Sequence, residues 1–454
     1  MPRNGKRRSK TGQINPTRII ALSFAGIILL GTLLLMLPVS SRSGTSCPPL
    51  TALFTATSAT CVTGLVMADT WSHWSAFGQV VIILLIEIGG LGFMSAASAV
   101  IFLFRRKIGL RQRMIMAQAI SVDDMQSVVK LQKWVILGSL LIQACGALIL
   151  FCRFLPEHGP ARAAAWGAFH AISAFCNAGF DIFGSIGPGQ SVAMFNGDPV
   201  VLLTLSGLVI LGGLGFLVWE EVIRVKRFRK FSVYTKLVLI GTSVLLISAM
   251  ALFLLIEWKN PETLGKMPWW QKLLNSFFQS VTLRTAGFAS FDQAGLTEGG
   301  KAVSIIYMLI GGSSGSTAGG AKTVTFMVLL LFVGTRLRGR TAVTVYKHSI
   351  LPEKVMDAMM IISVMVGLSL VGAIVISTTS PVTFTDGLYE AVSALATVGL
   401  TAGVTTSLSL PAQLLVILFM YFGRVGILTI SLGFLMGDRA EERFRYAHTN
   451  LLIG

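Results

Sequence analysis

The sequence predicts an all-α integral membrane protein built from four similar units, each a membrane span, a short re-entrant helix and a second span. Of its 454 residues, 53% are hydrophobic and only 13% are charged, and the mean hydropathy is +0.74. Soluble domains carry about a quarter charged residues, so this composition excludes a water-soluble enzyme and a disordered chain. Long apolar runs alternate with basic connections, and short apolar stretches ending in glycine lie between the runs.

Eight apolar runs are long enough to cross a bilayer, which takes roughly 20 mostly apolar residues. They lie near residues 19–38, 78–104, 134–155, 199–222, 236–258, 302–335, 355–377 and 410–436. We predict that each run is a transmembrane helix, which gives eight spans.

The basic residues predict the orientation of these spans. Segments 1–18, 105–133, 224–236, 336–354 and 438–454 hold 27 of the 37 Lys and Arg residues. Because Lys and Arg concentrate on the cytoplasmic side, we expect a multi-pass membrane protein with both termini in the cytoplasm. On a soluble protein the formal charge of +17 would suggest nucleic acid, but here the cations alternate with spans. We therefore expect no nucleic-acid partner.

Four short apolar stretches between the spans each carry a glycine near their end. They read FTATSATCVTGL (54–65), FHAISAFCNAGF (169–180), FFQSVTLRTAGF (277–288) and YEAVSALATVGL (389–400). The glycines Gly64, Gly179, Gly287 and Gly399 are 115, 108 and 112 residues apart. The regular spacing indicates a fourfold internal repeat rather than glycines that merely let helices pack closely.

The length and the backbone dipole of these stretches predict a binding site for cations. Stretches this short suit half-length helices, because they cannot cross the bilayer. A half-helix entering from outside directs its partly negative C-terminal end at the membrane centre, and backbone carbonyls beyond it can replace the hydration shell of an ion. Glycine adopts the required backbone angles at little cost. Four such loops predict a carbonyl ring that selects a weakly hydrated monovalent cation, with no catalytic constellation.

These motifs resemble the TrkH/TrkG/KtrB/HKT superfamily of potassium transporters over essentially the whole chain, and eight spans resemble its KtrB branch. The resemblance implies four pseudo-repeats of span–pore helix–span around a central ion pore that carries out potassium uptake. It implies that K+ is bound at filter carbonyls contributed by Val62, Thr63, Gly64, Asn177, Ala178, Gly179, Thr285, Ala286, Gly287, Thr397, Val398 and Gly399.

The resemblance also implies the setting of the pore. It implies a homodimer in the bacterial cytoplasmic membrane, surrounded by membrane lipid, and a cytoplasmic nucleotide-binding regulatory subunit resembling the KtrA/TrkA ring. No covalently bound cofactor is implied. K+ is the substrate ion, and Na+ is a candidate stimulating ion.

The third repeat departs from its siblings below the filter. Residues 310–323 read IGGSSGSTAGGAKT, and glycine costs about 1 kcal/mol against alanine in a helix. We expect this span to break into a movable gating loop at membrane-centre depth; the alternative is a close-packed helical interface. The candidate gate comprises Gly311, Gly312, Ser313, Ser314, Gly315, Ser316, Thr317, Gly319, Gly320 and Lys322, together with Arg424.

Arg424 is a charge inside a predicted span, where charges are costly and usually functional or paired. We hypothesise that it forms a positive barrier below the filter and holds the loop closed, as the resemblance also implies. The alternative is a stabilising ion pair, with Glu87 as a possible partner. Lys322 acts similarly or snorkels inward.

Four further residues near the filter are singled out by position. Asp69, Asp181 and Asp292 lie shortly after three of the glycines, where they either concentrate cations or act as solvated loop residues and helix caps. Arg284 precedes the third filter segment, and we expect its side chain to point behind the filter, toward a helix terminus or an acidic residue.

Two other functions stay open as alternatives. One is a sodium-passing or weakly selective channel of the same superfamily. The other is an intramembrane serine hydrolase, because Gly311–Gly315 fits GxSxG literally. That enzyme needs a base beside Ser313 or Ser314, and among the histidines only His170 lies in a predicted membrane-inserted element.

We divide the chain into four repeats with linkers and tails. The boundaries are 1–16 (basic tail), 17–104 (first repeat), 105–133 (linker), 134–223 (second repeat), 224–335 (linker and third repeat, with gating loop 311–322), 336–436 (linker and fourth repeat) and 437–454 (C-terminal tail). Because no soluble domain is present, we expect a regulatory subunit to dock on basic loops 105–133, 224–236 and 336–354. The tail 437–454 is a candidate dimer contact.

Overall fold

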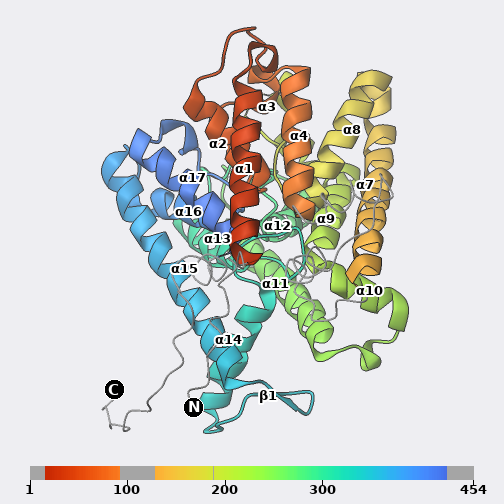
Figure 1. The fold of residues 1–454 in the computed structure, drawn as a ribbon, viewed down its shortest axis with the longest axis vertical. Helices are drawn as coiled ribbons and strands as arrows, with labels where there is room; N and C mark the ends of the chain where they lie inside the picture. Colours follow the sequence, from red (N-terminus) through yellow and green to blue (C-terminus); the bar gives the residue numbers. More distant parts are fainter. Residues whose placement is uncertain (1–15, 93–127, 188, 427–454) are drawn as a thin grey trace, which may run out of the picture.

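The computed structural model describes residues 16–92, 128–187 and 189–426. Predictions for the basic tail, most of the first linker and the C-terminal tail therefore lie outside the described residues. Within the described residues the chain is predominantly helical, and its long helices stand side by side in a bundle, several of them inclined to one another (Figure 1).

Four long apolar helices form the first span of each repeat. They are α1 (Pro16–Met36), α7 (Val128–His158), α11 (Val233–Glu257) and α15 (Pro352–Thr379). At 1.5 Å per residue, the 25 residues of α11 reach about 37 Å, which exceeds the roughly 30 Å hydrocarbon core. Only 28% of each span's most apolar window is buried inside the protein. The remaining apolar surface suits lipid, and the fold is that of a multi-pass membrane protein.

A shorter helix follows each first span and packs against it. These re-entrant helices are α2 (Pro49–Thr60), α8 (Pro160–Phe175), α12 (Trp269–Thr282) and α16 (Phe384–Leu395). They begin earlier than the apolar stretches predicted and end four or five residues before Gly64, Gly179, Gly287 and Gly399. Proline is the first residue of α2 and α8, where its missing N–H costs no hydrogen bond.

Two of the second spans are interrupted: the break in the third repeat was predicted, whereas the bend in the second repeat corrects the expectation of a continuous span. The second spans begin with α4 (Ala76–Leu91), α9 (Pro199–Leu214), α13 (Glu298–Leu309) and α17 (Leu410–Val425). The predicted span 199–222 bends by 94° between α9 and α10 (Phe216–Val225). The predicted span 302–335 breaks between α13 and α14 (Thr323–Leu337). Residues 93–104 and 427–436 lie outside the described residues, so the number of eight spans stays a prediction.

The remaining elements are short connections at the two ends of the helices. They are η1 (Pro38–Ser40), α3 (Thr70–His73), η2 (Phe183–Ser185), η3 (Ala193–Phe195), η4 (Phe228–Lys230), β1 (Thr344–Val345), β2 (His348–Ser349) and η5 (Thr405–Ser407). The two strands pair antiparallel as a small hairpin beyond α14 (Figure 1).

The buried core lies around the re-entrant helices. Trp166, Phe175 and Tyr389 on these helices have no exposed surface, whereas Leu22, Leu141 and other apolar residues of the first spans are largely exposed. The first spans thus separate the re-entrant helices and the loops after them from the surroundings.

Candidate functional site

The four glycines predicted from the repeat meet around one centre. A methyl group built on each glycine would strike the main-chain carbonyl just before the glycine of the next repeat. The pairs are Gly64 with Ala178 (2.5 Å), Gly179 with Ala286 (2.8 Å), Gly287 with Val398 (2.6 Å) and Gly399 with Thr63. Because the contacts run from each repeat to the next and close on the first, the four loops form a ring.

The backbone of each loop is left-handed at two positions. The four glycines have φ between 69° and 101°, and the residue two places before each is also left-handed. These are Val62 (φ 57°), Asn177 (59°), Thr285 (66°) and Thr397 (52°). A left-handed β-branched residue is a genuine outlier that persists only where surrounding structure imposes it. The same strain at the same position in all four repeats indicates that the ring geometry is built in.

Hydrogen bonds hold the loops back against their own re-entrant helices. The N–H groups of Thr63, Ala178 and Val398 donate to carbonyls of Ser58, Ser173 and Ser393, each at 2.8 Å. Serine hydroxyls on two helices accept from the N–H of Gly64 and of Gly399, each at 3.0 Å. The loop donors therefore point away from the centre of the ring.

The carbonyls of the same loops are left without partners. Among the described residues, none of the twelve predicted filter residues accepts a hydrogen bond at its main-chain oxygen. Buried carbonyls are almost always paired in proteins. A set of unpaired carbonyls around one centre is the arrangement that coordinates a dehydrated cation.

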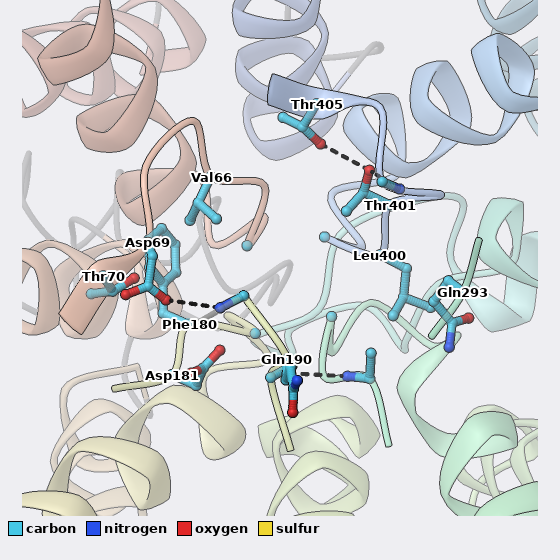
Figure 2. A pocket seen from close by; sticks show the side chains of 18 of the residues that line it. Val66, Asp69, Thr70, Phe180, Asp181, Gln190, Gln293, Leu400, Thr401 and Thr405 are labelled. Carbon is cyan, nitrogen blue, oxygen red and sulfur yellow. Dashed lines mark hydrogen bonds between the residues drawn. The ribbon is translucent and has the colours of Figure 1, made fainter. Parts of the chain in front are cut away.

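A cavity of about 580 Å³ opens on the side of the ring predicted to face outward. It is lined by all four ring glycines and by Asp69, Asp181 and Asp292. Figure 2 shows Asp69 and Asp181 on one side of this cavity, opposite Thr401 and Gln293. The three carboxylates predicted at the outer mouth are therefore brought to one space.

These carboxylates also serve local structure. Asp69 caps α3 by accepting from Ser72 N–H at 2.7 Å, so the alternative of a helix cap holds for this residue. The pKa of Asp181 is raised to about 7, chiefly by burial; a hydrogen bond from Phe183 N–H opposes the rise, and the neighbouring Asp69 charge adds to it. Asp181 thus changes charge near neutral pH at the mouth of the cavity.

Of two polar side chains behind the loops, the sequence reasoning missed Glu390 and named His170 only as a candidate base. Glu390 on α16 is fully buried and accepts from the hydroxyls of Thr405 (2.5 Å) and Thr401 (2.8 Å) just beyond the fourth loop. At the equivalent position of α8, His170 accepts from Ile182 N–H at 3.2 Å. The available signal was the polar residue nine places before the glycine in an otherwise apolar helix.

The segment between α13 and α14 lies directly beneath the ring. It is non-helical from residue 310 to residue 322 and is tied to the second repeat. Ser313 N–H donates to the Gly213 carbonyl at 3.0 Å, and the Thr317 hydroxyl donates to the carbonyl of Phe175, the last residue of α8, at 3.1 Å. The predicted break therefore sits at the inner end of a re-entrant helix.

Arg424 connects this segment to two other repeats. Its guanidinium donates to the carbonyls of Thr317 and Gly89, and to that of Gly90 at 3.0 Å. The suggested ion pair with Glu87 is wrong within the described residues, because Glu87 instead accepts from Gln143 (3.0 Å) and from the Cys176 thiol (3.3 Å). The carbonyls at the end of α4 lack helical partners, and the planar guanidinium can bridge them.

Two further cations border the segment. Lys322 Nζ donates to the Ala318 carbonyl at 2.8 Å. Arg284 is buried, and its Nη2 donates to the Thr323 hydroxyl at 3.3 Å, so its partner is the first residue of α14 rather than an acidic side chain. No described residue forms an ion pair with either of them.

The geometry gives no support to the serine hydrolase. The Ser313 hydroxyl makes no hydrogen bond to any described residue. Both ring nitrogens of His170, the candidate base, are engaged by main-chain groups of Trp166 and Ile182. A nucleophile–base contact is therefore not formed by these residues.

Comparisons with known proteins agree with this geometry. The family model TrkH, described as a cation transport protein, matches residues 6–443. The chain is 39% identical to the potassium/sodium uptake protein NtpJ of Enterococcus hirae, over 97% of this chain and 98% of that protein. It is 38% identical to the Ktr system potassium uptake protein B of Bacillus subtilis, over 95% and 96%.

A solved structure has a similar fold. The crystal structure of the potassium transporter TrkH from Vibrio parahaemolyticus aligns with a TM-score of 0.71 at 17% identity, covering 94% of this chain and 86% of that one. At this identity the similarity concerns the fold alone.

Proposed function

Since this chain belongs to the TrkH family of cation transport proteins, we propose that it is the ion-conducting subunit of a Ktr/Trk-type potassium uptake system. The observation that carries the proposal is the closed ring of four loops whose carbonyls have no hydrogen-bond partner among the described residues. These oxygens replace water around K+, which enters from the outer cavity and moves inward down its electrochemical gradient. K+ is the substrate, and no cofactor takes part.

The residues of each filter segment act through their backbone. The carbonyls of Val62, Thr63 and Gly64, and of the corresponding residues in the other three repeats, bind the ion. The left-handed residue and the glycine turn successive carbonyls toward the axis. The side chains behind them, such as Glu390, hold the loops in place.

We propose that residues 311–322 are the gate. The segment lies beneath the ring, and Arg424 holds it by donating to the Thr317 carbonyl. The positive charges of Arg424 and Lys322 oppose a cation leaving the filter while the segment is closed. Opening requires Arg424 to release Thr317 or to move together with it.

The family and the names of its members support a proposal about partners and location. Two relatives are named as components of Ktr systems, which supports a transporter that works with other subunits. We propose a homodimer in the bacterial cytoplasmic membrane, with both termini in the cytoplasm and the tail 437–454 as a dimer contact. A nucleotide-binding ring docks on loops 105–133, 224–236 and 336–354, and Na+ stimulates uptake.

The second candidate is a sodium-passing or weakly selective pore. It is favoured by the 39% identical relative, which is named a potassium/sodium uptake protein. The two candidates share the ring and differ in how strictly it discriminates between ions.

Flux through purified protein in liposomes separates these candidates. We expect Rb+ uptake driven by an inward gradient, competed by K+ and at least about tenfold faster than Na+ uptake, which corresponds to about 1.4 kcal/mol of discrimination. Equal Rb+ and Na+ rates would favour the weakly selective pore. Absence of any cation flux, together with labelling of Ser313 or Ser314 by a fluorophosphonate, would replace both with the hydrolase.

A further inference from the structure

The connection between α10 and α11 carries exposed cations at the end of a membrane-crossing helix. Lys226, Arg227, Arg229 and Lys230 are all exposed and form no ion pair within the described residues. They lie just before Ser232, the residue that caps α11. Because α11 crosses the membrane, residues that directly precede it lie at the level of the lipid headgroups.

The helix before this connection is set across the bundle rather than along it. α10 leaves α9 at 94°, and it crosses below α9 and α7 in Figure 1. Its inner face packs on the protein through Phe216 and Val218, which are buried. Nearer its end, toward the basic connection, Ile223 is 50% exposed.

Acidic residues of α10 do not neutralise the cations. Both oxygens of Glu221 are used at the start of α11, where they accept from Ser232 N–H (2.6 Å) and from the Thr235 hydroxyl (2.5 Å). Glu220 pairs only with Arg224, at 3.6 Å and largely exposed, a contact worth little. The connection therefore keeps a net positive charge and a fixed position.

Apolar side chains are interleaved with these cations. Phe228 is 45% exposed and lies between Arg227 and Arg229. A basic segment with outward-facing apolar residues at the membrane boundary is the pattern of interfacial lipid-binding segments.

We propose that Ile223 and residues 226–230 form a binding site for anionic phospholipid of the cytoplasmic leaflet. The cations contact the headgroup phosphates while Ile223 and Phe228 contact the acyl chains. This site rests on the orientation proposed above and not on conduction of ions. It removes residues 226–230 from the surface proposed for the regulatory subunit.

Lipid binding to the full chain tests this proposal directly. Phosphatidylglycerol and phosphatidylcholine are titrated onto the detergent-solubilised protein, and the bound lipids are counted by native mass spectrometry. We expect phosphatidylglycerol to bind more tightly than phosphatidylcholine. In a variant with Lys226→Gln, Arg227→Gln, Arg229→Gln and Lys230→Gln, we expect its affinity to fall by about fivefold for each neutralised cation at low salt.

A matched variant controls for net charge. Arg336→Gln, Arg338→Gln, Arg340→Gln and Lys347→Gln remove the same charge from exposed positions in the last turn of α14 and the connection after it, and we expect them to leave the affinity unchanged. The double change Ile223→Ser and Phe228→Ser keeps every charge and is expected to weaken lipid binding by removing the acyl-chain contacts.

Several results would overturn the proposal. Unchanged phosphatidylglycerol affinity in the first variant would do so, as would an equal loss in both charge variants, which would indicate net charge alone. Displacement of the lipid by millimolar inorganic phosphate would reassign the site to a free anion. Unchanged lipid binding with loss of a cytosolic subunit would reassign it to protein docking.

Discussion

The ring of glycines and the level directly beneath it differ in how strictly they keep the fourfold repeat. In the ring, all four repeats have the same two left-handed positions and the same contact with the next repeat. Beneath it, α4, α9 and α17 end at single left-handed glycines, Gly92, Gly215 and Gly426, whereas α13 and α14 are separated by the whole segment 310–322. One repeat thus has a long non-helical segment at the level where the described helices of the other three end at a single glycine.

This difference indicates which part of the molecule requires the fourfold symmetry. An ion on the axis is coordinated from all sides, so each repeat must supply equivalent oxygens. A gate needs only one element that can occupy or leave the path. Segment 310–322 is closed on itself by hydrogen bonds such as that from Gly311 N–H to the Ala321 carbonyl at 2.8 Å. It is also bonded to the second and fourth repeats, so its position depends on its neighbours as well as on its own sequence.

The largest expected effect is on the ring itself. In Gly399→Ala, the added methyl group would strike the Thr63 carbonyl at a left-handed position. We expect potassium uptake to fall by about ten- to hundredfold, because strain of this kind costs about 1–3 kcal/mol. Rubidium flux in liposomes measures it. Gly26→Ala, on a helix face with no atom within 4 Å, is the control and should transport normally. Normal ion selectivity in Gly399→Ala would contradict the inference that the ring needs the same geometry in all four repeats.

The next largest effect is expected at Arg424, whose hydrogen bonds hold the segment of the third repeat. Arg424→Ala removes the hydrogen bonds to Thr317, Gly89 and Gly90. We expect flux in the absence of a regulatory subunit to rise by about tenfold, since hydrogen bonds to a charged group are worth about 1.5–3 kcal/mol. Arg424→Lys keeps the charge but lacks the planar fork, so its flux should be intermediate. Unaltered flux in both variants would show that the segment is held by other contacts.

Gly215 and Gly92, which end α9 and α4, differ in the atoms that surround them. A methyl group on Gly215 would meet the Ser314 carbonyl at 2.8 Å, whereas one on Gly92 meets no described atom within 4 Å. Both are left-handed, so both alanine variants carry backbone strain. We expect Gly215→Ala to change flux by about threefold more than Gly92→Ala, because strain of about 1 kcal/mol or more is added at the segment. Equal changes of flux in the two variants would mean that contact between residue 215 and the Ser314 carbonyl does not affect segment 310–322.

A separate effect, on ion selectivity, is expected behind the fourth loop. Glu390→Gln weakens the bonds from Thr401 and Thr405, and the ratio of rubidium to sodium flux should fall by about three- to tenfold, in line with the loss of a charged hydrogen bond. Glu257→Gln is the matched control. Glu257 is equally buried and accepts from the hydroxyls of Thr263 and Thr297 far from the ring. A similar loss in the control would indicate a general folding defect.

The smallest effect is expected at the outer mouth. With its pKa raised to about 7 by burial, Asp181 is charged above pH 7 and neutral below it. Uptake at limiting potassium should therefore increase by about two- to threefold from external pH 6 to pH 8, since a single charge adds modestly to the field that attracts cations. In Asp181→Asn this dependence should disappear. A pH profile that persists in the variant would assign it to another group.

Much of the fold could be predicted because its signals are local. Apolar length predicts the first spans, and α1, α7, α11 and α15 are long enough to cross. The spacing of the ring glycines predicts four loops, because each needs its own left-handed residue. The bend after α9 was not predicted, because Phe216–Val225 is apolar enough to continue a span and the close approach of Ser314 to Gly215 belongs to another repeat.

What the sequence by itself determined is the set of four units, the glycine in each and the weak helix-forming stretch of the third. These depend on chain length, hydropathy and backbone freedom, which adjacent residues decide. Only the tertiary structure decided that the glycines face the carbonyls of the next repeat, that Arg424 binds carbonyls rather than Glu87, and that Glu390 has threonine partners. The physical reason is that the closed ring and the buried hydrogen bonds join groups that lie far apart along the chain. A local sequence pattern does not predict which distant group will be the partner.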